Sequence, residues 1–253
     1  MAYVQFTIQI DCEDVEPSRI IPHIHGEIFD YPEEGSGEEL GQKIGHLNAY
    51  LVQRSRAVND GASLFDAMDS IDQSVRDCYA ALFEEPTVEW GEAVEKLYGV
   101  EIGEEDVLFL DSIELEPKHR GKGIGPQAVQ ELIATFASSG IALVACKPFP
   151  LQYSQWNADD EEHKRKREQP GFEEKRIADF ARVTKVWTDL GFRKLPNDSG
   201  FYTYAPQFSR QPDLPRVPRR RRRTRKTLKV GELKSFRNAG TVPLTSPNKL
   251  STM

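Results

Sequence analysis

The feature that most constrains this chain is a strand, a glycine-rich turn and a helix in direct succession. Apolar residues from Val107 onward begin a buried strand that runs to Leu115, and Pro117 ends it. The turn that follows places three glycines at alternate positions, at Gly121, Gly123 and Gly125. A helix comes next, marked by apolar residues at spacings of three and four: Val129, Leu132, Ile133 and Phe136.

This arrangement suits a bulky anion. The first turn of a helix has unpaired N–H groups and a partial positive charge. Glycines without a Cβ let the backbone approach an anion closely. Arg120 and Lys122 add positive charge to the same turn. We therefore predict that the turn binds a diphosphate.

Two better-known phosphate motifs do not fit the same residues. A dinucleotide fingerprint needs Gly-x-Gly-x-x-Gly directly after the strand, whereas the glycines here are at 121, 123 and 125. A nucleoside-triphosphate loop needs Lys followed by Ser or Thr after its last glycine, but Pro126 and Gln127 follow here.

The rest of the chain up to residue 205 predicts alternating strands and helices around one core. Strands are expected at residues 4–10, 20–31, 44–52, 141–146 and 201–204. Helices are expected at residues 64–82, 92–97 and 177–190, the first of them as one continuous amphipathic helix. Residues 141–146 are wholly apolar, which is typical of a strand covered on both faces. Residues 157–168 are densely charged and are expected to form an exposed insertion.

The charge of the chain is divided unevenly. The net charge of −7 combines +11 in residues 206–253 with −18 in residues 1–205. We expect a folded acidic domain over 1–205 and a disordered basic tail over 206–253. The arginine run at residues 219–226 is interpreted either as a nuclear address in a eukaryote or as a solvated tail. Nucleic acid is an expected partner only through this tail.

The strand, turn and helix resemble motif A of the GNAT superfamily of N-acetyltransferases. The family pattern Gln/Arg-x-x-Gly-x-Gly/Ala is matched by Arg120, Gly123 and Gly125. The preceding Ile113, Leu115 and Pro117 match the strand ending of that motif, and residues 45–51 resemble an early strand of the family. Leu190, Gly191 and Phe192 resemble its last motif.

The resemblance implies a fold and a cofactor. The fold would be α/β, with a mixed, splayed central sheet flanked by helices. Acetyl-CoA or another acyl-CoA would enter the gap between the strands that end at Leu115 and Cys146. Backbone groups of Ile113 and Leu115 would pair with the pantetheine arm. The pyrophosphate would be held by Arg120, Gly121, Lys122, Gly123, Ile124 and Gly125.

The resemblance also implies an activity, N-acyl transfer by direct attack of a primary amine on the thioester. The amine would belong to a small molecule or a peptide, and the acidic domain favours a cationic one. Asp111 is the candidate general base, and Glu114 is a weaker one. Trp187 stands where the family often has a tyrosine acid, which leaves water, Tyr202 or Tyr204 to protonate the thiolate. The alternative function is a catalytically weak acyl-CoA-binding module that recruits a partner through its tail.

Other residues are interpreted as structural. His23, His25 and His46 have no metal-ligand spacing, and His119 is expected to be exposed, so no metal is predicted. Cys146 ends an apolar strand and is interpreted as a core residue. No apolar run spans a membrane and no secretory signal is recognised at the N-terminus. An intracellular location, cytoplasmic or nuclear, is therefore expected.

Overall fold

A computed structural model describes residues 2–9, 19–30, 41–99, 102, 105–136, 140–153, 165 and 167–207. The chain divides into two units, residues 1–212 and 213–253, and the described residues all belong to the first. The expected insertion at 157–168 lies almost wholly outside them, as does the basic tail beyond residue 207. The expectations for these two segments, including the boundary at residue 205, stay predictions.

One seven-stranded sheet organises the first unit, in the order β1-β2-β3-β4-β5-β7-β6. Strands β1 to β4 are joined by successive antiparallel pairs, β4 and β5 are parallel, and β7 pairs antiparallel with both β5 and β6. The strands are β1 (Ala2–Gln9), β2 (His23–Asp30), β3 (Lys43–Val52), β4 (Asp106–Leu115), β5 (Ile141–Cys146), β6 (Arg193–Lys194) and β7 (Tyr202–Tyr204). The predicted mixed sheet and its flanking helices are confirmed.

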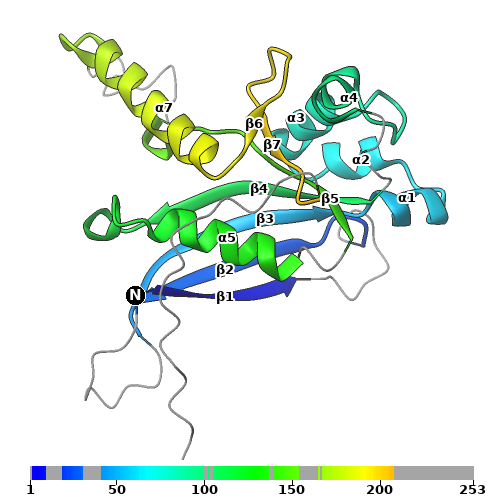
Figure 1. Ribbon diagram of the computed structural model, residues 1–253, viewed down its shortest axis with the longest axis horizontal. Coiled ribbons are helices and arrows are strands. Elements are labelled where there is room, and N and C mark those ends of the chain that lie inside the picture. Colours follow the sequence, from blue (N-terminus) through cyan, green and yellow to red (C-terminus); the bar gives the residue numbers. More distant parts are fainter. Residues whose placement is uncertain are drawn as a thin grey trace, which may run out of the picture. The chain divides into compact units, whose positions relative to one another are not determined.

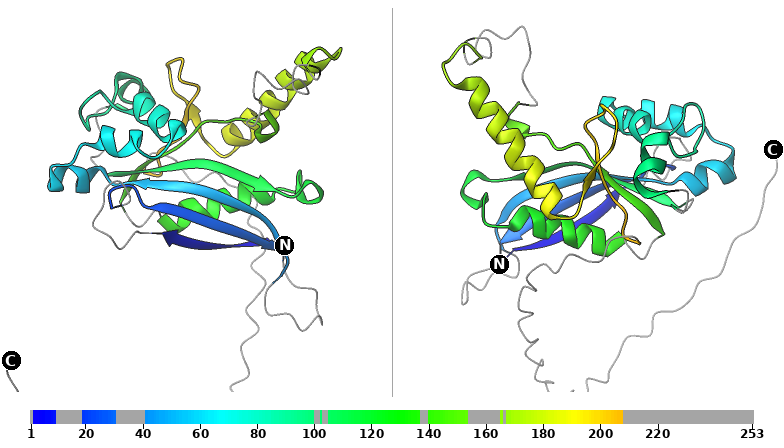
Figure 2. Two further views of the ribbon diagram at one scale, coloured as in Figure 1. Left: turned by 180° about the vertical axis from the view of Figure 1, so that it is seen from behind. Right: turned by 45° about the horizontal axis from the view of Figure 1, so that its top comes forward.

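Helices cover both faces of this sheet (Figures 1 and 2). On one face α5 (Ile124–Phe136) packs across the strands. On the other face stand α7 (Phe172–Asp189) and a group of short helices, with β4 running beneath both (Figure 1). The short helices are α1 (Arg54–Asp60), α2 (Leu64–Asp69), α3 (Gln73–Leu82) and α4 (Glu92–Tyr98).

The prediction of one helix over residues 64–82 is wrong, because the structure has two helices, α2 and α3, with a break between them. The Ser63 side chain accepts a hydrogen bond from the Asp66 N–H at 3.2 Å and caps the start of α2. Asp72 accepts from the Val75 N–H at 2.9 Å and caps a second start. The continuous apolar stripe hid this break because both helices face the same core.

Helix α1 and strand β6 were not predicted, nor were two 3-10 helices, η1 (Pro117–His119) and η3 (Leu151–Tyr153). Helix α1 lies between the strand expected at 44–52 and the helix expected at 64–82, where no element was predicted. It ends at Gly61, whose φ of 66° is left-handed as expected for a helix C-terminus. Strand β6 has two residues, too few for an alternating pattern. The other predicted elements agree with observed ones within a few residues at each end, including β5, whose six residues are all buried.

The main core lies between the sheet and the α1–α4 group. Phe109 on β4 stacks near Tyr50 on β3 and tilts against Phe201, with ring centroids 6.2 and 6.0 Å apart. Buried Arg54 of α1 donates to the Val88 carbonyl and lies over the Trp90 ring at 3.9 Å. Arg54 also donates to the Glu105 carbonyl at 3.4 Å and the Ser55 hydroxyl donates to the Asp106 carboxylate at 3.1 Å, so α1 is attached to the beginning of β4.

Candidate functional site

The candidate site lies where β4 and β5 part. The two strands pair from Asp106 opposite Ile141 to Leu110 opposite Cys146, and there β5 ends. Strand β4 continues to Leu115 with β3 as its remaining partner. Among the described residues, no strand pairs with its second edge from Asp111 onward, as the predicted splayed sheet requires.

A β-bulge marks the same position. Ala49 of β3 pairs with Leu110, and the preceding Asn48 pairs with Ser112, so Asp111 is an extra residue on β4. A bulge of this kind turns side chains away from the regular alternation, and bulges are common beside active sites. It directs Asp111 toward α3, where its Oδ1 accepts a hydrogen bond from the Ser74 hydroxyl at 2.7 Å.

A narrow cleft of about 50 Å³ opens beside the bulge. Its floor is β4 from Leu110 to Ile113, and Cys146 and Lys147 lie across from it. The remaining lining residues are Phe149 and Leu151 from the loop after β5 and Trp187 from α7. The cleft is mainly apolar, with Asp111, Ser112 and Lys147 as its polar groups.

A buried carboxylate holds the outer wall of this cleft together. Asp179 of α7 accepts hydrogen bonds from the Tyr153 hydroxyl at 2.9 Å and from the Gln152 side chain at 3.1 Å. Phe149 packs edge-on against Phe180 of the same helix, with centroids 5.2 Å apart. The loop after β5 is thereby attached to α7.

The glycine turn lies beyond the end of β4 and is open. Gly121 and Gly123 have φ values of 72° and 80°, and a Cβ at either would meet nothing within 4 Å. The first bond of α5 runs from the Gln127 N–H to the Gly123 carbonyl at 3.1 Å. No hydrogen bond among the described residues uses the N–H groups of Gly121, Lys122, Gly123, Ile124 or Gly125. Five consecutive amides are thus available to an anion.

Arg120 differs from the rest of the turn. Its N–H donates to the Pro117 carbonyl at 3.3 Å, so this amide is not free for an anion. Its Nε donates to the Leu115 carbonyl at 2.8 Å, which ties the turn to the end of β4 and occupies that oxygen. The guanidinium is exposed, with a terminal nitrogen 4.0 Å from a Glu114 carboxylate oxygen.

Ile113 and Leu115, whose backbone groups were predicted to contact the pantetheine arm, lie at the end of β4 beside the first turn of α5. Gly125 lies in the first turn of α5, and a Cβ there would be 3.9 Å from both Ile113 Cδ1 and Leu115 Cδ1. The side chains of Ile113 and Leu115 therefore point toward α5. The structure brings Asp111, Ile113, Leu115 and the turn together along one strand, and their roles stay predictions.

Tyr50 belongs to the polar group around Asp111, although the sequence analysis did not single it out. Burial, then the negative charges of Asp72 and Asp111, raise the pKa of Tyr50 to about 12. Tyr50 therefore stays neutral at physiological pH. The sequence around Tyr50 gives no signal that it lies near these carboxylates, because Asp72 and Asp111 are 22 and 61 positions away along the chain.

Trp187 lines the cleft, whereas the two candidate tyrosine acids, Tyr202 and Tyr204, do not. Trp187 lines the cleft, is 7% exposed and packs edge-on against Phe192 at 5.1 Å. Tyr204 is buried against Phe192 at 5.6 Å and does not line the cleft. Tyr202 pairs with Cys146 across β5 and β7 and is not a lining residue either.

A polar row crosses the face of the sheet opposite α5. His25 Nδ1 lies 3.1 Å from Asn48 Oδ1, and Asn48 Nδ2 donates to Ser112 Oγ at 3.2 Å. His46 stacks on His25 at 6.1 Å and lies 3.9 Å from Glu114. The sequence analysis treated these histidines singly, because the antiparallel register that aligns them cannot be read from one strand.

The described residues contain no group of three or more His, Cys, Asp or Glu side chains able to hold a metal ion. Contrary to the expectation of exposure, only 12% of the His119 side chain is exposed. Burial raises the pKa of the Cys146 thiol well above its ordinary value. Within the described part of the chain, no helix is long and apolar enough to cross a membrane.

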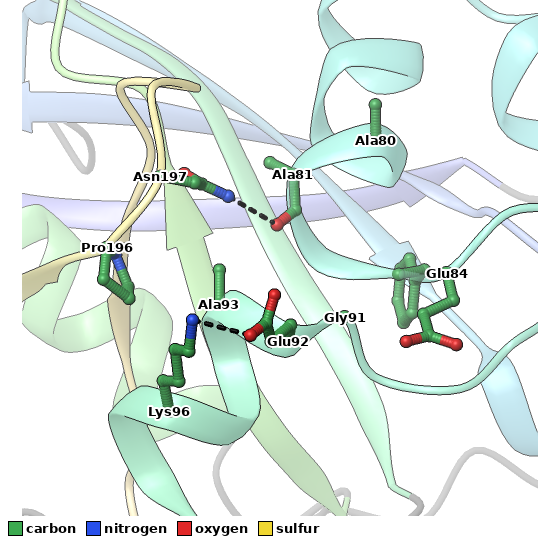
Figure 3. A pocket seen from close by; sticks show the side chains of 10 residues that line it. Ala80, Ala81, Glu84, Gly91, Glu92, Ala93, Lys96, Pro196 and Asn197 are labelled. Atoms are coloured by element: carbon green, nitrogen blue, oxygen red, sulfur yellow. Dashed lines mark hydrogen bonds and ion pairs between the residues drawn. The ribbon is translucent and has the colours of Figure 1, made fainter.

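A larger pocket of about 290 Å³ lies elsewhere, between α3, α4 and the turn before β7 (Figure 3). Lys96 on its wall is paired with Glu92 at 2.6 Å, and Asn197 donates to the Ala81 carbonyl at 3.4 Å. The side chains of Lys96, Glu92 and Asn197 are thus engaged with each other or with the backbone. We place the candidate site in the smaller cleft, because the bulge and the free edge of β4 meet there.

The sequence of this chain was compared with protein families and with curated proteins. Residues 41–151 match the model of the acetyltransferase (GNAT) family. No curated protein matches the chain with significant sequence similarity.

Several solved structures resemble the fold. An apo mutant of agmatine N-acetyltransferase is 11% identical, with 71% of this chain and 75% of that one covered and a TM-score of 0.34. Arabidopsis thaliana NAA60 in complex with acetyl-CoA is 10% identical, with 72% and 76% covered and a TM-score of 0.33. The Drosophila melanogaster polyamine N-acetyltransferase is 10% identical, with 71% and 74% covered and a TM-score of 0.34. The resemblance predicted from Arg120, Gly123 and Gly125 is confirmed by the family match, in which residues 41–151 of this chain are similar to the acetyltransferase (GNAT) family.

Proposed function

We propose that the protein is an N-acyltransferase that moves an acetyl or other short acyl group from acyl-CoA to a primary amine. One observation supports this above the others. Strand β4 continues past the end of β5, through the bulge at Asp111, to a turn whose five amides have no hydrogen-bond partner in the described part of the chain. Members of the matched family use acetyl-CoA, and the open backbone edge followed by free amides suits the pantetheine arm and the pyrophosphate of that cofactor.

In this proposal each part of the edge has a separate task. The amides of residues 121–125 hold the pyrophosphate, and the partial positive charge at the start of α5 favours it. The free edge at Ile113 and Leu115 runs beside the pantetheine arm. Because Arg120 already occupies the Leu115 carbonyl, that oxygen is not offered to the cofactor unless the Arg120 side chain moves.

The reaction would take place in the cleft beside the bulge. A backbone N–H of β4 would polarise the thioester carbonyl as the oxyanion forms. Asp111 lines the cleft, and no hydrogen bond among the described residues uses its Oδ2 atom. That oxygen is the one we assign to the amine proton, directly or through a water molecule. The apolar walls and small volume favour a short acyl group.

The second candidate is an acyl-CoA-binding module with little catalysis. It is favoured by Trp187, which lines the cleft at the position of the family's tyrosine acid. An indole N–H cannot supply a proton to a thiolate, so protonation of the leaving group would depend on water.

One experiment separates the two candidates. Acetyl-CoA should raise the melting temperature of the full chain under both, because a ligand that binds the native state stabilises it. Release of free CoA on adding polyamines, aminoglycosides, amino acids or basic peptides is expected for the transferase alone. Binding without release across the whole panel would favour the module, and no binding of acetyl-CoA would reject both.

A further inference from the structure

The Ser74 hydroxyl lies between two carboxylates. Its Oγ is 2.8 Å from Asp72 Oδ1 and 2.7 Å from Asp111 Oδ1. Asp72 and Ser74 stand at the start of α3, whereas Asp111 is the bulged residue of β4 that lines the cleft. A short helix thereby connects the candidate base to a second carboxylate behind it.

The number of protons limits what this arrangement can do. A hydroxyl carries one proton, so it can donate to only one of the two carboxylates at a time. Asp72 Oδ1 also accepts the Val75 N–H at 2.9 Å and is thus held as an acceptor by its capping role. When the hydroxyl donates to Asp72, its oxygen lone pairs face Asp111. Both short contacts become hydrogen bonds once Asp111 receives a proton.

We propose that Ser74 and Asp72 are positioning residues that form a proton relay behind Asp111. The inference rests on the proposed function. As the amine attacks, its N–H bond breaks and the proton is taken up by the Asp111 carboxylate. Rotation of the Asp111 carboxyl group about its Cβ–Cγ bond brings the oxygen that took up the proton to Ser74 Oγ. The proton then passes to Ser74 Oγ while the hydroxyl proton of Ser74 passes to Asp72 Oδ1. The transfer moves two protons, changes no oxidation state and leaves Asp111 ionised again.

Neighbouring groups are consistent with this role. Tyr50 on β3 faces both carboxylates and stays neutral. No Lys, Arg or His among the described residues forms an ion pair with Asp72 or Asp111. On α3, Arg76 pairs with Asp69 and Asp77 pairs with Lys147, each at 3.0 Å. Both cations are thus engaged with carboxylates other than Asp72 and Asp111.

One substitution can remove the proton-accepting role of Asp72 while keeping its structural role as a helix cap. Asn caps a helix as well as Asp does, so Asp72→Asn should keep the Val75 contact and the melting temperature while removing the proton acceptor. Ser74→Ala removes the hydroxyl, and Ser74→Thr restores one. Ser63→Ala is the matched control, because Ser63 caps α2 without contacting the cleft.

The test uses the full chain, acetyl-CoA and the amine that releases CoA fastest in the panel. Single-turnover rates are measured in mixtures of H2O and D2O. We expect Asp72→Asn and Ser74→Ala to lower the rate about tenfold or more, with acetyl-CoA binding unchanged. A plot of the single-turnover rate against the fraction of D2O should be curved in the wild type, where two protons move through the relay. The same plot should be linear in both variants. Ser74→Thr should restore rate and curvature, and Ser63→Ala should lower only the melting temperature.

The failures can be told apart. A wild type that releases CoA, with Asp72→Asn and Ser74→Ala equally fast or equally curved, would overturn the relay and leave the proposed function standing. If the wild type released no CoA with any amine, the proposed function would be rejected and the relay with it. Loss of rate in Ser74→Ala without rescue by Ser74→Thr would also count against the relay.

Discussion

Gly45 on β3 lies directly opposite Leu115 on β4, and there is no room for a side chain between them. A Cβ at Gly45 would be 2.7 Å from Leu115 Cδ2 and 3.2 Å from Leu115 Cα, and it would overlap the Glu114 carbonyl oxygen. The end of β4 can approach β3 this closely because residue 45 is glycine. This contact sets the position from which the turn begins.

Gly45→Ala should therefore disturb the site as well as the fold. Relief of the overlap requires β4 to shift, at a cost of about 1–3 kcal/mol in the free energy of unfolding. The shift would move Leu115 and weaken acetyl-CoA binding. Denaturant unfolding and calorimetry of acetyl-CoA binding measure the two effects. Lys43→Ala, an exposed change on the same strand, is the control, and a Gly45→Ala protein as stable as this control would contradict the argument.

Gly123→Ala tests whether the turn binds the cofactor. Its φ of 80° disfavours any Cβ, and the added methyl would stand where the pyrophosphate approaches. Gly61→Ala has a similar φ of 66° and the same open surroundings, far from the site. Both variants should lose about 1 kcal/mol of stability. Calorimetry should find acetyl-CoA binding at least tenfold weaker in Gly123→Ala alone, whereas equal affinities in the two variants would place the cofactor elsewhere.

Arg120→Ala should weaken acetyl-CoA binding about fivefold, which corresponds to about 1 kcal/mol. The variant loses a positive charge beside the pyrophosphate and the hydrogen bond that ties the turn to Leu115. Affinity should also depend less on salt than in the wild type, since an exposed charge is screened by ions. Isothermal titration at two salt concentrations checks both effects. Lys118→Ala, a nearby cation paired with Glu116, should bind like the wild type.

The buried thiols should not react with thiol reagents in the native protein. Burial raises the pKa of both Cys78 and Cys146, so neither forms the reactive thiolate near neutral pH. A Cys12→Ser variant isolates these two among the three cysteines of the chain. We expect no colour with an aromatic disulfide reagent until denaturant is added, and then two equivalents. Rapid native labelling of Cys146 would reopen a chemical role for it.

Tyr50 should ionise near pH 12, about two units above an ordinary tyrosine. Between pH 10 and 12 the unfolded chain would release a proton that the native protein keeps, so stability falls as pH rises through this window. The absorbance at 295 nm of the wild type minus that of Tyr50→Phe should give the midpoint. Asp72→Asn should lower it by removing one of the negative charges. A difference midpoint at pH 10 would contradict the cluster around Asp111.

The elements that local patterns specify were predicted from the sequence. The strand, turn and helix from Val107 to Phe136 were recognised because their apolar periodicities and glycines are local, and the family match agrees with them. The break between α2 and α3 was not predicted, since the apolar residues of both helices form one continuous stripe. Only the capping contact of Asp72 shows that a second helix begins there. The short strand β6 escaped because two residues give no period.

The sequence by itself determined the glycine turn and the strand that leads into it. It also named Asp111 as a candidate base and Trp187 at the position of the family's tyrosine. Only the tertiary structure decided that β5 stops opposite Leu110, that a bulge turns Asp111 toward Ser74, and that His25, Asn48 and Ser112 form one row. The physical reason is that register and bulges follow from pairing between strands distant in the chain. A local pattern specifies which face a side chain occupies, and only packing specifies what it meets there.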